Sequence, residues 1–137
     1  MNSFSRSGLS QYRNVGVIGH VESANPHKLV CLLYEGLSEA LSTARGAIER
    51  GDRQSKSTAI GKAAGIIDAL RSSIDTQRGG AIAENLERLY DYMGRKLTDA
   101  NLHNDLDALH EVANVNATLS AAWNTIPEAV RQQAAAA

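Results

Sequence analysis

Apolar residues recur every three or four positions along most of this chain, in four blocks separated by polar or glycine-containing stretches. This spacing places the apolar side chains of each block on one face of an α-helix. The blocks cover about residues 25–51, 53–75, 86–104 and 105–126. Four helices of this length with short links predict an all-α fold, an antiparallel up-down four-helix bundle.

Capping residues mark the ends of the expected helices. Asn25 and Pro26 suit the start of the first helix, because an Asn side chain can accept free backbone amides and proline needs no N–H there. Gly51 suits the left-handed position that often follows a last helical turn. Asn104 or Asp105 can cap the start of the fourth helix. The order of these residues supports four separate helices.

The same pattern predicts which side chains form the core. The apolar series is unbroken over residues 60–74, and a second series runs through residues 86–100. Tyr90 lies one position off that second series, so we expect its ring to pack while its hydroxyl reaches a surface partner. Tyr92 lies further round, and packing and partner binding are both open for it. The expected interior residues are Leu33, Ile67, Leu86, Leu89, Met93, Leu97, Leu109 and Leu119.

Residues outside the four blocks form an N-terminal arm (1–24) and a C-terminal tail (127–137) around a bundle domain (25–126). The arm is polar and rich in glycine and serine, yet Leu9 and Tyr12 lie three residues apart, so one helical turn places both on one side. A disordered tail has no need of such apolar residues. We therefore expect the arm, or a short helix within it, to dock on another surface, and the tail to be flexible.

Composition narrows the class of protein. The 137 residues are 43% hydrophobic, enough for one independently folding domain. The 14 basic and 15 acidic residues nearly cancel and form no basic stripe, which argues against nucleic-acid binding. Cys31 is the only cysteine, which excludes an internal disulfide. With no apolar stretch long enough to span or enter a membrane, we expect a cytoplasmic protein.

Residue patterns typical of catalysis are scarce. The chain has no glycine-rich phosphate loop, no HExxH and no GxSxG. Asp107, His110 and Glu111 form the nearest group of metal-ligand types, but a metal site needs three or four converging ligands. We therefore expect no enzyme activity, no cofactor and no metal. A metal- or thiol-dependent bundle enzyme using these residues or Cys31 is the alternative, and a dimeric regulatory bundle is a weaker one.

The most specific motif lies in and around the third expected helix. Residues 79–105 read GGAIAENLERLYDYMGRKLTDANLHND. This segment resembles the signature of the FliS family, in which GG-E-IA, NL, LYDYM, AN and ND follow one another at these spacings. Ala81 stands where the family has Glu. The segments 8–12 (GLSQY) and 25–30 (NPHKLV) also resemble family motifs, so the resemblance covers nearly all of residues 8–126.

The resemblance implies a function and two partners. FliS-type proteins are four-helix bundles of the bacterial cytosol that bind the disordered C-terminal segment of flagellin. They prevent its premature polymerisation and assist its delivery to the flagellar type III export gate. The implied partners are thus the flagellin C-terminal segment and the cytoplasmic domain of an export-gate membrane protein, while a homodimer is left open.

The resemblance also suggests roles for particular residues. In the family, the aliphatic–Tyr pair that Leu9 and Tyr12 resemble is associated with docking onto the export gate; the competing interpretation is that the arm plugs the empty flagellin groove. Asn116 stands where the family usually has an aliphatic residue, and we expect it to face the bundle edge or to bond a backbone group, because a buried unpaired amide costs about 1–3 kcal/mol. Surplus apolar positions on the last three helices predict a flagellin groove lined or bordered by Ile60, Ala64, Ile67, Tyr92 and Trp123.

Overall fold

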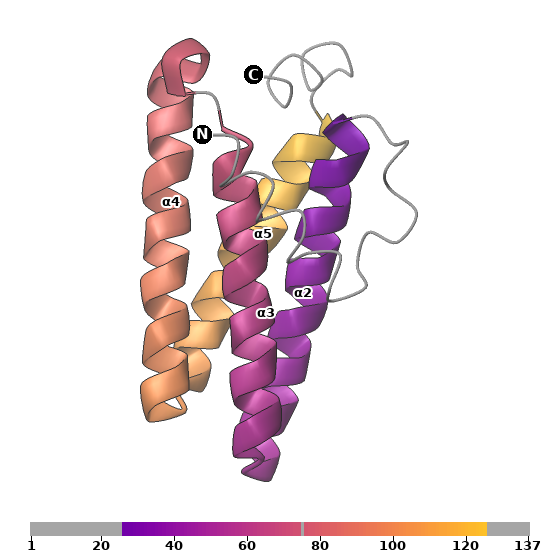
Figure 1. Cartoon of the computed structure of the whole chain (residues 1–137), viewed down its shortest axis with the longest axis vertical. Coiled ribbons are helices and arrows are strands. Elements are labelled where there is room, and N and C mark those ends of the chain that lie inside the picture. Colours follow the sequence, from indigo (N-terminus) through magenta and orange to yellow (C-terminus); the bar gives the residue numbers. More distant parts are fainter. Residues whose placement is uncertain (1–25, 75, 126–137) are drawn as a thin grey trace.

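The computed structural model describes residues 26–74 and 76–125 and folds them into four α-helices. They are α2 (Pro26–Arg50), α3 (Arg53–Ser72), α4 (Thr76–His103) and α5 (Leu106–Thr125). The helices run alternately up and down in one bundle (Figure 1). Each packs against two neighbours, so that α2 lies diagonally opposite α4, and α3 lies diagonally opposite α5. The predicted all-α bundle is confirmed, while the arm, the tail and Asn25 lie outside the described residues.

The turns at the lower end of the bundle in Figure 1 follow from local side-chain chemistry. Gly51 takes a φ of 73° between α2 and α3, the left-handed conformation expected of it. Asp52 then caps α3 by accepting the backbone N–H of Ser55 at 3.1 Å, and this hydrogen bond lowers the pKa of the Asp52 carboxyl. Between α4 and α5, Asn104 has a φ of 53°, and Asp105 accepts the backbone N–H three residues further on. Asp105 therefore caps α5, and Asn104 ends α4.

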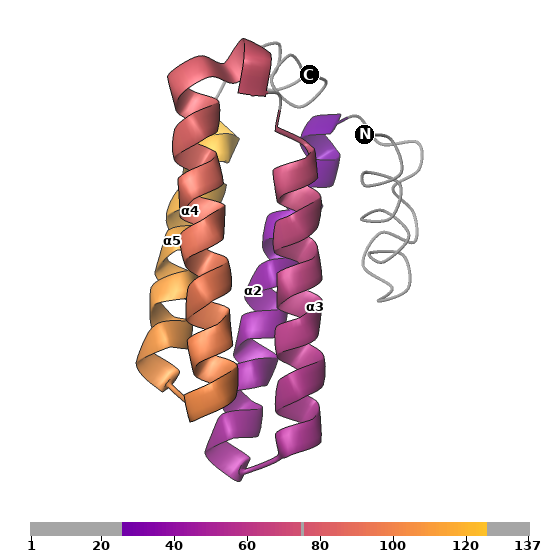
Figure 2. The same ribbon diagram turned by 60° about the vertical axis from the view of Figure 1, so that its left-hand side comes forward.

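The start of α4 is kinked. Gly80 has φ 54° and ψ −129° inside the helix, so the first turn of α4 points away from the rest of it (Figure 2). Non-glycine residues rarely adopt this conformation. A side chain added at the preceding Gly79 would overlap the Cβ of Ala83. Both glycines are therefore required by the kink, and the third expected helix begins at Thr76, well before residue 86.

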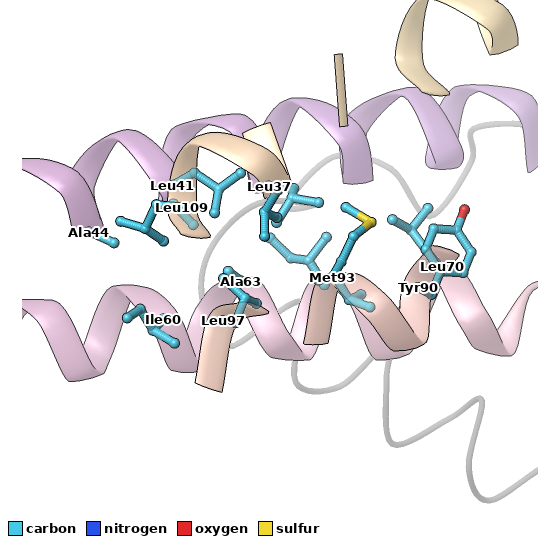
Figure 3. Packing of buried hydrophobic residues seen from close by; sticks show 14 of the residues in the cluster. Leu37, Leu41, Ala44, Ile60, Ala63, Leu70, Tyr90, Met93, Leu97 and Leu109 are labelled. Atoms are coloured by element: carbon cyan, nitrogen blue, oxygen red, sulfur yellow. The ribbon is translucent and has the colours of Figure 1, made fainter. Parts of the chain in front are cut away.

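The core fills the space between the four helices (Figure 3). Five of the expected interior residues are buried, namely Leu33, Ile67, Met93, Leu97 and Leu109. Leu86 and Leu119 are partly buried and pack against this core from its edge. The expected helix faces of α2, α3 and α5 are therefore correct.

The prediction for Leu89 is wrong. Leu89 is only half-buried, and its neighbour Tyr90 takes the interior position with 2% of its surface exposed. The buried stripe of α4 passes through residues 86, 90, 93 and 97. A series of 86, 89, 93 and 97 satisfies the helical spacing equally well. Periodicity alone could not choose between them, and a buried hydrogen-bond partner for the Tyr90 hydroxyl decides for the tyrosine.

A buried lysine ties α3 to the end of α4. Lys56 is 8% exposed, and its ammonium donates to the backbone carbonyl of Asn101 at 2.9 Å and to the side-chain oxygen of Asn104 at 2.8 Å. The carboxyl end of a helix carries partial negative charge, which stabilises a cation placed there. The aliphatic stem of Lys56 continues the apolar stripe of α3 by one turn below Ile60. One side chain thus serves both the core and the α4–α5 turn.

Replacing Lys56 should therefore destabilise the bundle. Lys56→Met keeps the apolar stem but removes the charged donor that joins α3 to Asn101 and Asn104, and we expect a loss of about 1–3 kcal/mol in the free energy of unfolding. Lys62→Met, on the same helix but without these contacts, should change it by less than about 0.5 kcal/mol. Chemical denaturation measures both, and equal effects would show that the Lys56 hydrogen bonds contribute nothing.

Candidate functional site

The structure separates the residues predicted to line a partner groove. Tyr92 of α4 and Trp123 of α5 lie on the two sides of α5, and both are half-buried. The other three belong to α3, the helix diagonally opposite α5. Ile60 and Ile67 are buried in the core, whereas Ala64 is exposed. The five side chains therefore do not form one continuous surface. Leu9 and Tyr12 lie outside the described residues.

Tyr92 belongs to a small polar cluster between α4 and α5. Its hydroxyl donates a hydrogen bond to the Glu111 carboxylate, and this bond raises the pKa of Tyr92. The ammonium of Lys96 lies 3.6 Å from the same carboxylate and 5.6 Å from the centroid of the Tyr92 ring. Beside the cluster is a shallow hollow of about 470 Å³ lined by Tyr92, Arg95, Lys96, Thr98 and Asp99. The ring is thus held in place at the surface by its polar neighbours.

Trp123 joins the end of α5 to the start of α2. Its indole N–H donates to the backbone carbonyl of His27 at 3.3 Å, and the two rings lie 5.5 Å apart between centroids. One turn along α2, the Cys31 thiol donates to the side-chain oxygen of Asn124 at 3.5 Å. Part of the Trp123 ring therefore stabilises the bundle, and the rest is accessible at its surface.

The outward face of α5 between these two rings carries no charge. No Asp, Glu, Lys, Arg or His occurs from Val112 to Thr125. By contrast, the exposed positions of α2 include Glu35, Glu39 and Arg45. A surface helix usually carries charged residues opposite its buried stripe. The neutral face of α5 is therefore the best candidate for a docking surface, and its exposed residues include Asn114, Ala117, Thr118, Ala121 and Ala122. The charge-free run from Val112 to Thr125 could have indicated this face from the sequence.

Polar side chains also meet inside the bundle. The hydroxyls of Tyr34 on α2 and Tyr90 on α4 are 3.0 Å apart, and both residues are buried. The expectation that the Tyr90 hydroxyl reaches a surface partner is therefore wrong. Asn116 of α5 is 4% exposed and donates to the backbone carbonyl of Tyr34 at 3.2 Å. The expected bond between Asn116 and a backbone group is confirmed.

The residues named for a metal-dependent enzyme do not converge on a metal site in the described part of the chain, whereas the Cys31 thiol named for a thiol-dependent enzyme lies 3.7 Å from a ring nitrogen of His27. Among the described residues, no three His, Cys, Asp or Glu side chains are close enough to hold a metal ion together. Asp107 and His110 are exposed, and Glu111 is engaged by Tyr92 and Lys96. Within the described residues, none of the four helices has the continuous apolar length that a membrane-spanning segment requires.

The buried tyrosine pair predicts a loss of stability at alkaline pH. Burial raises the pKa of both Tyr34 and Tyr90 above the ordinary value of 10.0. Above about pH 10 the unfolded chain loses these protons while the folded chain keeps them, so the free energy of unfolding falls as the pH rises. A variant carrying Tyr34→Phe and Tyr90→Phe should show a shallower decline between about pH 9 and 11 in denaturation experiments. An unchanged slope would contradict this assignment.

Comparisons with known proteins all indicate the same family. Residues 8–130 match the family model described as flagellar protein FliS. The chain is 42% identical over 123 residues to the flagellar secretion chaperone FliSB of Pseudomonas aeruginosa, an alignment covering 90% of this chain and 98% of the relative. It is 42% identical over 132 residues to the flagellar secretion chaperone FliS of Salmonella typhimurium, covering 95% and 98%. The FliS of Bacillus subtilis is 31% identical over 112 residues, covering 82% and 83%.

Proposed function

This chain belongs to the FliS family of flagellar secretion chaperones, and we propose that its client is flagellin. In this proposal it acts in the bacterial cytosol, binds the disordered C-terminal segment of flagellin and prevents that segment from polymerising early. It then assists delivery of flagellin to the cytoplasmic domain of an export-gate membrane protein. The observation that carries the proposal is the neutral outer face of α5, which offers an apolar client a surface without charge.

The chemistry of the α5 face suits a client segment that folds on binding. An amphipathic segment lays its apolar side on a complementary groove or face, where charged groups would lose their hydration. Small exposed side chains such as Ala117 and Ala121 allow a client backbone to approach closely. At the two edges of this face, the half-buried rings of Tyr92 and Trp123 add apolar area. We propose both rings as client contacts.

The α3 residues of the predicted groove form a second, separate part of this proposal. Ala64 is exposed on α3, whereas Ile60 and Ile67 of the same helix are buried in the core. Because α3 and α5 are diagonally opposite, one client in contact with both must pass around the bundle. A long disordered segment can do so, since such segments wrap large surfaces.

A charge placed on α5 should weaken client binding. In Ala121→Glu the new carboxylate is desolvated under the client, and we expect the dissociation constant for a flagellin C-terminal peptide to rise by about tenfold or more. Ser42→Glu places the same charge at an exposed position of α2, between Glu39 and Arg45, and should change it by less than about twofold. Isothermal titration calorimetry measures both, and circular dichroism checks that both variants are folded. Equal affinities would remove α5 from the client site.

The N-terminal arm is proposed as a separable element that docks on the export gate. In the competing interpretation the arm, through Leu9 and Tyr12, plugs the empty client groove and is displaced by flagellin. Both roles are compatible, because a plug released by the client becomes free for the gate. A plug also lowers the apparent client affinity, because part of the population is closed.

Deleting residues 1–20 distinguishes these roles. We expect binding of the flagellin peptide to tighten or to stay unchanged, and binding to the cytoplasmic domain of the gate protein to be lost. Calorimetry with each partner measures the two affinities separately. Clearly weaker peptide binding by the folded truncation would place the arm within the client site and exclude the plug.

A further inference from the structure

An exposed apolar surface lies near the start of α4. Ile82 is 72% exposed, and it shares one side of the helix with the partly buried Leu86 and Leu89, because residues four and seven positions apart lie on the same side. The kink at Gly80 turns the first turn of α4 aside, and neither Gly79 nor Gly80 has a side chain that covers Ile82 (Figure 2). The apolar stripe of α4 is therefore open at this end.

This surface differs from an isolated apolar residue, which is common on proteins and needs no explanation. Leu102, near the other end of α4, is 70% exposed. It lies two positions beyond the buried Ala100 and therefore points away from the core stripe. Ile82, by contrast, extends the stripe by one turn beyond Leu86. Leu102 is thus an ordinary surface residue, whereas Ile82 lies where a further apolar segment can extend the core.

The last helix ends at the same end of the bundle. α4 and α5 are antiparallel neighbours that diverge toward the upper end in Figure 1. The hydrogen bond between Tyr92 and Glu111 defines how they align. Ile82 comes ten residues before Tyr92, and Ala121 comes ten residues after Glu111, so these two residues lie at about the same height along the bundle. α5 ends one turn later, at Thr125.

The residues that follow α5 have a pattern that suits this surface. Residues 126–137 read IPEAVRQQAAAA and lie outside the described residues. Pro127 cannot continue α5 but suits the first position of a new helix, and the Glu128 carboxylate favours a helix start. Alanine, glutamine and arginine, which make up most of the remainder, are strong helix formers. Such a helix carries Ile126, Val130, Ala134 and Ala137 on one side and Glu128, Arg131 and Gln132 on the other.

We propose that residues 126–137 fold back as a short amphipathic helix and cover Ile82, Leu86 and Leu89. The segment is attached at the same end of the bundle, so its effective concentration at this surface is high. Twelve residues span about 18 Å as a helix and about 40 Å when extended, which is enough to reach from α5 to the neighbouring helix.

Docking and helix formation depend on each other in this proposal. An isolated helix of this length is marginal in water, so the segment is helical only while its apolar side is buried on α4. The flexible tail expected from the sequence is then the undocked form of the same segment. The contact lies within one chain, and the inference is independent of flagellin as the client.

Thiol protection tests the docking. In a Cys31→Ser background, Ala134→Cys places the only thiol on the apolar side of the segment, and Gln132→Cys places it on the polar side. We expect alkylation of the Ala134→Cys variant to be slower by about tenfold or more, because only the undocked population reacts. Dividing each rate by that of the same variant in urea removes the influence of sequence neighbours. Circular dichroism checks that both variants are folded.

Two exposed residues of α4 provide a matched pair of further variants. Ile82→Asp places a carboxylate in the covered surface, where docking would desolvate it, and should remove the protection of the thiol in Ala134→Cys. Leu102→Asp makes a similar change at a similarly exposed position near the other end of the helix and should leave the protection unchanged. Neither side chain is buried, so both variants should remain folded.

Three results would overturn the proposal. Equal normalised rates for the two thiols would show that the segment does not dock. Protection that persists in Ile82→Asp would place the segment on a different surface. Protection that increases with protein concentration would assign the covering segment to a second copy instead of the same chain.

Discussion

The hydroxyl pair of Tyr34 and Tyr90 holds together two helices that are not neighbours. α2 and α4 lie diagonally across the bundle. Tyr34 extends from α2 and Tyr90 from α4, so that their hydroxyl oxygens are 3.0 Å apart. A buried hydroxyl without a partner is costly, so each ring requires the other. This requirement sets the rotation of α4, brings Tyr90 rather than Leu89 into the core and leaves Tyr92 at the edge facing Glu111.

α5 combines a polar group on its inner face with an uncharged stretch on its outer face. Asn116 of α5 points inward to the backbone of α2, while the outward positions of the same helix from Val112 onward carry only uncharged side chains. α5 thus differs from an ordinary surface helix on both faces. Its inner amide joins α5 to α2, and its outer surface is the face that we propose for client binding. In the proposed function, the inner amide helps to keep the bundle folded while the outer face binds the client.

Some features could be read from the sequence because they depend on neighbours along the chain. Gly51 takes the expected left-handed conformation, Asp105 caps α5, and the four apolar blocks correspond to four helices. The family could also be identified, because the LYDYM segment and its flanking motifs are long and specific. Lys56 was overlooked although it continues the apolar stripe of α3, since a lysine at such a position is ordinarily assigned to the surface.

Other features depend on contacts between residues far apart in the chain. Leu89 and Tyr90 fit the helical spacing equally well, and only the position of Tyr34, 56 residues away, decides between them. The predicted groove residues lie on three different helices, because the pattern shows which face of a helix is apolar but not which helices become neighbours. The sequence by itself determined four helices, the caps at Gly51 and Asp105, and the family. The tertiary structure decided how α4 is rotated and which helices become neighbours, because both depend on contacts between residues far apart in the chain.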